Sequence, residues 1–114
     1  MDEGRMSSIS DVVADSMDDF FKDRVKDVVI EGIEEDTEKS SFKVKFCLYN
    51  YSVLSFEFFN GMIEIGIIYG KNGETINLLK GTFEKDNLEI LWQKIDEEIR
   101  LRIPDKYLKK NGWL

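Results

Sequence analysis

The chain has no histidine, a single cysteine (Cys47) and a single proline (Pro104). The lack of histidine removes the commonest general base and metal ligand, together with Ser-His and Cys-His nucleophiles. One cysteine excludes an internal disulfide and suits a reducing compartment. No stretch approaches the ~18 unbroken apolar residues of a membrane span, and residues 1–5 lack the order of a secretory signal. We therefore expect a cytoplasmic protein that does not associate with membranes.

The 114 residues are 42% hydrophobic and 12% aromatic, which is typical of a globular protein. We expect a single domain over residues 1–114, with residues 1–7 frayed. The net charge of −7 argues against nucleic acid as a partner, because binding it requires clustered Lys and Arg. Residues 1–38 hold 13 acidic and 4 basic residues, whereas residues 39–114 hold 10 and 12. This asymmetry indicates either an acidic face for a positively charged partner or a solvated surface.

Two Asn-Gly pairs, Asn60-Gly61 and Asn72-Gly73, predict β-hairpins, because tight hairpin turns need positive φ at both central residues. A two-residue turn at Asn60-Gly61 places Phe59 opposite Met62 and continues with Phe58–Ile63, Phe56–Ile65 and Leu54–Ile67. The second turn pairs Tyr69 with Ile76 and Ile67 with Leu78. Both registers bury the same apolar face, as alternation requires.

Two further strands precede this pair of hairpins, at residues 25–33 and 42–49. In the first, Val28 and Ile30 are expected to face the core, with Val29 and Ile33 on the other side. The second alternates strictly between apolar and polar residues. A three-residue loop at 50–52 then sets Leu48 opposite Leu54 and Phe46 opposite Phe56. Gly66 is expected to form a bulge or bend.

Helices are predicted at both ends of the chain. The N-terminal helix has Ser7 or Ser8 as its N-cap, and its apolar stripe comprises Ile9, Val12, Val13, Met17, Phe20 and Phe21. The C-terminal helix follows a capping box at residues 86–89 and ends near Ile103, because Pro104 disfavours helical geometry before it. A short helical turn then runs to Lys110, and Trp113 and Leu114 are expected to pack back against the body of the protein. The expected fold class is α+β: an N-terminal helix, a five-stranded antiparallel β-meander and a C-terminal helix packed on the sheet.

The second face of this sheet is unusually apolar for a solvated surface. Its residues are Val29, Ile33, Tyr49, Val53, Phe59, Met62, Ile68 and Leu79, interrupted by Lys43, Lys45, Glu57 and Glu64. Three arrangements explain it. The N-terminal helix covers it, or both helices lie on the opposite face and leave it for a partner or a second copy, or it is an apolar-tinged surface.

No residue pattern predicts a catalytic site, a cofactor or a metal. Glu57 and Glu64 face each other in the predicted register and resemble an acid–base pair, but Lys45 opposite Glu57 explains them equally well as a charged ladder. Cys47 lies beside Lys43 and Lys45, which would lower its pKa, yet it lacks a histidine base. The acidic loop at 31–38 lacks calcium-loop spacing. The basic C-terminal residues fit the dipole of a helix end better than an anion site.

The closing stretch, from Trp92-Gln93-Lys94-Ile95 through Arg102-Ile103-Pro104-Asp105 to Trp113, completes a small acidic chain of helix–meander–helix order. In these respects the chain resembles bacterial immunity proteins, small cytoplasmic inhibitors encoded beside secreted toxins. The resemblance covers most of the chain and is one of type, without a shared motif. It implies a non-catalytic inhibitor that binds a basic toxin domain, often a nuclease. The expected contact surface comprises Glu31, Glu34, Glu35, Asp36, Glu38, Glu57 and Glu64 with the exposed aromatic residues Tyr49, Tyr51 and Phe59.

Another function fits the same composition. A small acidic secretion chaperone or adaptor would form a homodimer through the apolar second face and carry an extended segment of another protein. A stable homodimer without any partner would favour this alternative, whereas one-to-one capture of a toxin domain would favour an immunity protein.

Overall fold

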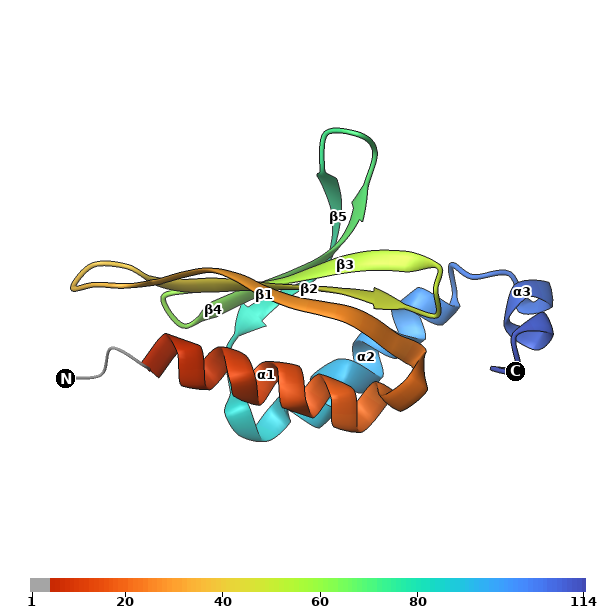
Figure 1. Cartoon of the computed structure of the whole chain (residues 1–114), viewed down its shortest axis with the longest axis horizontal. Helices are drawn as coiled ribbons and strands as arrows, with labels where there is room; N and C mark the ends of the chain where they lie inside the picture. The colour runs from red at the N-terminus through yellow and green to blue at the C-terminus, as the bar shows by residue number, and fades with distance from the viewer. Residues whose placement is uncertain (1–4) are drawn as a thin grey trace.

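The computed structural model describes residues 5–114 and shows two helices on one face of a five-stranded sheet (Figure 1). Helix α1 (Arg5–Phe21) is followed by a short 3-10 turn and then by the sheet. A second 3-10 turn (Lys85–Asn87) leads into α2 (Leu88–Arg100), and α3 (Asp105–Lys110) lies at the end of the sheet. The α+β fold class expected from the sequence is confirmed.

The sheet is an antiparallel meander in which the spatial order of the strands, β1-β2-β3-β4-β5, follows the chain. Its strands are β1 (Val25–Glu35), β2 (Ser40–Leu48), β3 (Ser52–Phe59), β4 (Met62–Tyr69) and β5 (Glu74–Thr82). Each strand therefore lies beside the strand that precedes it, and β1 and β5 form the two edges.

Both helices cover the phenylalanine-rich face of the sheet (Figure 1), so the helix placement of the second arrangement is confirmed. Trp92 of α2 is fully buried at the centre, where its ring lies 5.7 Å from that of Phe56 and 6.0 Å from that of Phe21. On the opposite face Val29, Val53 and Met62 are each about half exposed, at 49%, 45% and 53%. That face is therefore uncovered by any other described element, and Val29 lies on it as predicted. Ile33 does not, because the register shift between Glu31 and Glu34 brings it into phase with Glu35, which reaches α1.

Helix α1 begins earlier than predicted. It starts at Arg5, so neither Ser7 nor Ser8 caps it, and residues 5–7 are helical rather than frayed. Residues 1–4 of the predicted frayed segment lie outside the described part. The fully buried positions include Met6 and Ser10, whose hydroxyl donates to the carbonyl of Ser7 at 2.8 Å. This local bond satisfies the hydroxyl of a buried serine within the helix.

The β3–β4 register matches the prediction, from Phe59 opposite Met62 to Leu54 opposite Ile67. The β2–β3 register differs by two residues: Leu48 lies opposite Ser52, and Phe46 opposite Leu54. The loop has three residues as predicted, but they are 49–51. Tyr49 leaves the strand with a φ of 60° and its side chain is buried, so the strand ends one residue early.

The distal part of the β4–β5 hairpin, beyond the last pairs of β4 with β3 at Ile67 and Ile68, projects away from the sheet as an arm (Figure 1). The predicted two-residue turn is wrong here, because four residues separate Tyr69 from its partner Glu74. A register shift at Gly66 bends the hairpin and confirms the predicted bulge. It also moves Leu79 opposite Ile65, on the core side rather than on the uncovered face.

Replacing Gly66 with alanine is expected to destabilise the protein by about 1–3 kcal/mol, because overpacking costs energy of this order. A Cβ at this position would lie 2.8 Å from the backbone oxygen of Ile76, and a backbone atom cannot swing aside as a flexible side chain can. Urea unfolding followed by circular dichroism measures the change. A Gly66→Ala protein as stable as the native chain would show that the backbone at the bend shifts to accept a methyl group without loss of stability.

The C-terminal segments agree with the sequence in outline. The predicted capping box is wrong: Asn87 occupies the N-cap of α2 without a side-chain bond to the helix, and its amide instead donates to Glu84 at 3.2 Å. Helix α3 ends before Gly112, whose φ is 80°. Trp113 returns to the body and lies 5.3 Å from the Tyr49 ring, whereas Leu114 remains exposed.

Candidate functional site

Two hairpin ends meet at one end of the sheet. The Asn60 side chain accepts a bond from the Ser40 N–H at 2.7 Å and donates to the Glu38 carbonyl at 3.3 Å. The Asn60 N–H also donates to the Ser40 carbonyl at 2.8 Å. These three bonds fix the β1–β2 turn beside the β3–β4 turn. They therefore place the acidic turn next to Phe59, which precedes Asn60 in the chain.

The acidic turn, residues 34–39, carries four carboxylates and one lysine. Asp36 shapes it, because its Oδ1 accepts the N–H groups of Glu38 and Lys39 at 2.8 and 2.7 Å. Lys39 lies 3.0 Å from Glu34, and Glu35 accepts the N–H of Met6 at 3.2 Å. The turn is thus rigid and retains an excess of negative charge.

A shallow hollow of about 230 Å³ lies beside this turn on the uncovered face. Its lining comprises Glu57, Phe59, Met62, Ile63, Glu64 and Lys80. Phe59 and Met62 face each other across the β3–β4 pair and are each 53% exposed. The hollow therefore combines two exposed apolar side chains with two facing carboxylates, which is the composition of a docking site for a long cationic side chain.

Glu57 and Glu64 lie directly opposite each other, as predicted. The predicted position of Lys45 is wrong, because the shifted register places Lys43 opposite Glu57, with a nitrogen–oxygen distance of 3.9 Å. Lys80 lies 3.6 Å from Glu64. Both ion pairs are long and exposed, so each contributes little to stability and leaves the carboxylates accessible.

The two predicted tyrosines lie at the other end of β3, about 20 Å away at ~3.3 Å per residue. Tyr49 is not exposed as expected: it is 1% accessible, and its hydroxyl donates to Asp96 at 2.5 Å. Burial first, and then this bond to a carboxylate, raise the pKa of Tyr49 above its ordinary value. Tyr51 is half exposed and its ring lies 5.1 Å from that of Tyr107.

The structure thus gathers eight of the ten predicted residues at one end of the sheet. Glu31 joins this group because Lys43 lies between it and Glu57 in the register of β1, β2 and β3. Two residues of the site were not predicted for it from the sequence: Asn60, whose side chain joins the two turns, and Met62, which was expected on the second face but not in the contact surface. Met62 was recognisable from the sequence, since the Asn-Gly register already paired it with Phe59.

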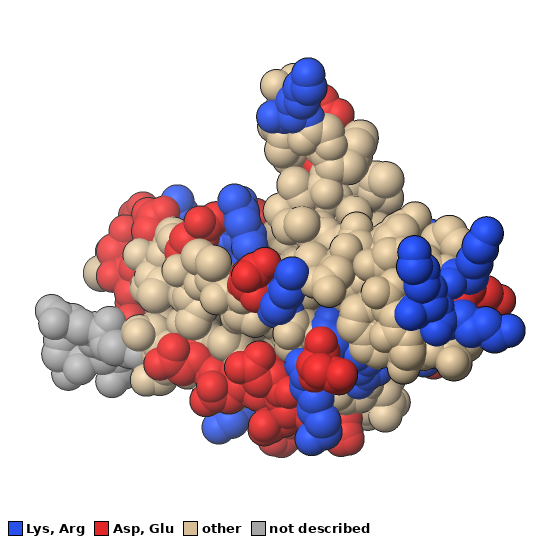
Figure 2. Space-filling view, turned by 45° about the vertical axis from the view of Figure 1, so that its right-hand side comes forward, with Lys and Arg blue, Asp and Glu red and all other residues tan. Residues whose placement is uncertain are grey.

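Charge is distributed unevenly over the surface. Figure 2 shows acidic side chains gathered over one end of the molecule and along its lower edge, with basic side chains at the tip of the arm and at the other end. The basic C-terminal residues lie in or beside α3 and the end of α2, remote in the chain from the acidic turn. Acidic side chains therefore cluster at one end and along one edge of the molecule (Figure 2).

Cys47 does not have the electropositive surroundings predicted for it. Burial raises its pKa, and this effect outweighs the lowering by Lys26; Asp27 raises it further. The thiol is therefore less reactive than an ordinary cysteine at neutral pH.

Within residues 5–114 we find no group of three or more side chains able to hold a metal ion. Among the helices that the structure describes, none has the length and apolar character needed to cross a membrane. Comparisons of the chain with protein-family models, curated proteins and solved structures found no match.

Proposed function

We propose that the chain is a non-catalytic inhibitor of the immunity type, which binds a basic toxin domain such as a nuclease and blocks its active site or a site nearby. The observation that carries this proposal is the hollow at the acidic end of the sheet. There Phe59 and Met62 are exposed beside two carboxylates and a rigid acidic turn. The proposal places the protein in the cytoplasm.

The hollow suits a lysine or arginine side chain of the partner. The apolar stem of such a side chain would cover Phe59 and Met62, and its charged end would reach Glu57 and Glu64. Desolvated aromatic anchors dominate the energy of most protein interfaces. Phe59 is therefore the residue on which affinity depends most.

The acidic turn has a different role. Toxin domains that act on nucleic acid carry positive charge, because they must hold a polyanion. The carboxylates of residues 34–38 extend the negative surface beyond the hollow and attract such a domain before contact. Association is therefore expected to slow as salt concentration rises, whereas dissociation depends mainly on the hollow.

Phe59→Ala is expected to weaken binding about tenfold, chiefly by faster dissociation. The binding partner to use is the basic C-terminal domain of the exported protein encoded by the neighbouring gene, and surface plasmon resonance measures both rates. Tyr69→Ala is the matched control, because Tyr69 is a similarly exposed aromatic residue, at 47%, but lies on the arm. It should leave binding unchanged.

Three results would contradict the proposal. The neighbouring genes could encode no such domain, the purified domain could fail to bind in a one-to-one complex, or co-expression could leave its toxicity undiminished. If the domain binds but Phe59→Ala and Tyr69→Ala weaken it equally, the hollow is not the contact site.

A further inference from the structure

Strand β5 is an open edge of the sheet. It pairs with β4 alone, and the N–H of Phe83 donates to the Gly61 carbonyl at 2.8 Å. Because backbone groups alternate in direction along a strand, Gly81 also faces β4, whereas the N–H and C=O groups of Lys80 and Thr82 face outward. The chain stays extended through Glu84, with φ −136° and ψ 109°. Lys80 and Thr82 therefore present outward N–H and C=O groups, and Glu84 adds its N–H, since its C=O already accepts the N–H of Asn87 at 3.0 Å.

The opposite edge is built differently. Strand β1 has two register shifts, with a φ of 57° at Asp27 and 64° at Gly32. Bulges of this kind interrupt the regular spacing that strand pairing needs. The edge at 79–84 follows the bend at Gly66 and has no such interruption. Between the two edges, only β5 offers a regular strand for a further strand to join.

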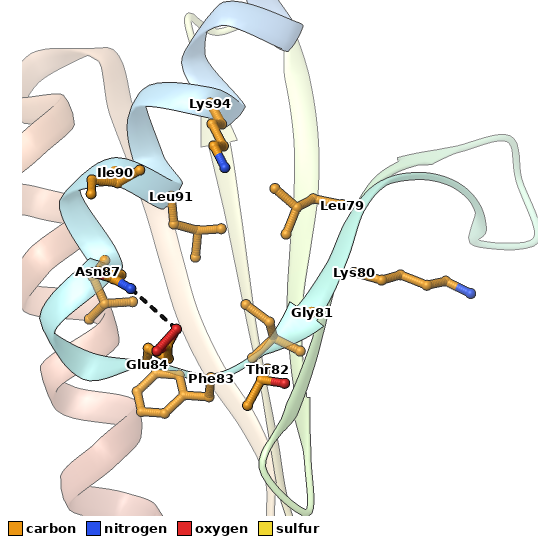
Figure 3. A pocket seen from close by; sticks show the side chains of 12 residues that line it. Leu79, Lys80, Gly81, Thr82, Phe83, Glu84, Asn87, Ile90, Leu91 and Lys94 are labelled. Atoms are coloured by element: carbon orange, nitrogen blue, oxygen red, sulfur yellow. Dashed lines mark hydrogen bonds between the residues drawn. The ribbon is translucent and has the colours of Figure 1, made fainter.

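A groove of about 310 Å³ lies beside this edge, between β5 and α2 (Figure 3). Leu79 and Leu91 approach it from the two sides, and Ile90 is 52% exposed. Gly81 leaves open space, since an added Cβ would meet nothing within 4 Å. Apolar side chains of an added strand would thus find an apolar surface beneath them.

We propose that the β5 edge binds a second copy of this chain, with two β5 strands pairing antiparallel about a two-fold axis at Thr82. In this register the outward groups of Thr82 meet those of its own counterpart, and Lys80 lies opposite Glu84 of the second copy. Gly81 lies opposite the second copy's Phe83, whose ring stays on its own Phe58 at 5.4 Å, and the open space at Gly81 lets the two backbones approach. The result is a continuous ten-stranded sheet.

Charge selects this register among the symmetric ones. A lysine in an edge strand normally discourages pairing, and an axis at Lys80 would set the two lysines face to face. An axis at Gly81 would set Lys80 opposite Thr82 without a charge partner. The axis at Thr82 forms two Lys80–Glu84 pairs, and opposite charges directly across a strand pair are favourable. Both side chains are exposed. Their present partners are weak, since Lys80 lies 3.6 Å from Glu64 and Glu84 accepts one bond from the Asn87 amide at 3.2 Å, so each can turn to the second copy.

The test is a charge swap followed by sedimentation equilibrium. The native chain is expected to form a dimer, and Lys80→Glu or Glu84→Lys should each weaken dimerisation about tenfold, because two attractive pairs become repulsive. An equimolar mixture of the two variants should dimerise like the native chain, since each acidic pair then meets a basic pair. Lys71→Glu, at the tip of the arm, makes the same charge change and should have no effect.

Circular dichroism establishes that each variant is folded before the comparison. A native chain that remains monomeric at millimolar concentration would overturn the proposal. Equal weakening of the dimer by Lys80→Glu and Lys71→Glu would also overturn it. The same holds if the mixture of Lys80→Glu and Glu84→Lys dimerises no more tightly than either variant alone. Lys80 also lines the hollow, whereas Glu84 does not. Glu84→Lys therefore tests self-association apart from the proposed capture of a toxin domain, which is measured separately with Phe59→Ala.

Discussion

Trp92→Ala is expected to lower the free energy of unfolding by about 3–5 kcal/mol, the usual cost of truncating a fully buried tryptophan. Trp92 has no exposed surface, and three aromatic rings surround it, from Phe21, Phe46 and Phe56, at 5.7 to 6.3 Å between centroids. These rings come from α1, β2 and β3, so the cavity would open between three elements at once. Close-packed surroundings of this kind collapse only partly into a void.

The indole N–H adds a smaller contribution. It donates to the Ser16 hydroxyl at 2.9 Å and thereby links α2 to α1. Trp92→Phe keeps most of the ring and loses this bond, so its cost should be about half that of alanine. Urea unfolding followed by circular dichroism compares the two variants, with Ile90→Ala as the exposed control on the same helix. A loss below about 1 kcal/mol for Trp92→Ala would show that the core lies elsewhere.

The sequence predicted the β3–β4 hairpin correctly because two local rules agree there. Asn60-Gly61 fits a two-residue turn, with φ values of 47° and 86°, and the alternation of apolar residues on both strands supports the same register. A slip of one residue would turn each buried side chain towards solvent. Where the turn residues and the alternation of apolar residues favour the same pairing, the register of a hairpin can be predicted from the sequence alone.

The errors occur where a distant residue determines the local structure. Tyr49 continues the alternation of β2, so it reads as an outward strand residue. Its partner Asp96 lies 47 residues later in the chain, and no local pattern indicates that bond. The β4–β5 turn is a related case: its Asn-Gly pair suggests two residues, but Gly70 also has positive φ, at 74°, and widens the loop.

The same distinction applies to the candidate site. The acidic loop and Phe59 are visible in the sequence, but their proximity depends on the Asn60 side chain, which bridges two hairpins 20 residues apart. The accessibility of the second face required knowledge of which face the helices cover, and amphipathic stripes do not specify that. The composition predicted acidic and aromatic residues at the surface. Only the three-dimensional arrangement shows which of them lie together and at which end of the sheet.

Asp96→Ala is expected to cost about 2–3 kcal/mol. Asp96 accepts from the Tyr49 hydroxyl and lies 3.4 Å from Arg24 and 3.9 Å from Arg100. Arg24 also donates to the Phe20 and Phe21 carbonyls at 2.7 and 3.0 Å, so one carboxylate joins α2 to the end of α1 and the β2–β3 turn. Removing it leaves the Tyr49 hydroxyl without its acceptor and the partly buried Arg24 guanidinium without its counter-ion, although its bonds to the two carbonyls remain. Breaking such a pair is costly, and the partial exposure of Arg24, at 24%, keeps the loss below that of a fully buried pair.

The matched control is Glu98→Ala, which removes an exposed carboxylate from the same helix and its pair with Arg102 at 3.2 Å. It should cost less than about 0.5 kcal/mol. Urea unfolding at pH 7 measures both changes. Equal losses for the two variants would contradict a special role for Asp96.

Alkaline pH gives a second readout of the Asp96 variant. Burial and the bond to Asp96 raise the pKa of Tyr49 in the folded protein above the ordinary tyrosine value of 10.0. The folded state therefore favours the neutral phenol. The resulting stabilisation is complete below pH 10 and is lost as pH rises through the folded-state pKa. Since Asp96 is one of the causes of this shift, Asp96→Ala should lose less additional stability above pH 10 than the native chain, and Tyr49→Phe should lack this contribution altogether. If the free energy of unfolding of Tyr49→Phe falls above pH 10 as steeply as that of the native chain, other groups cause the fall.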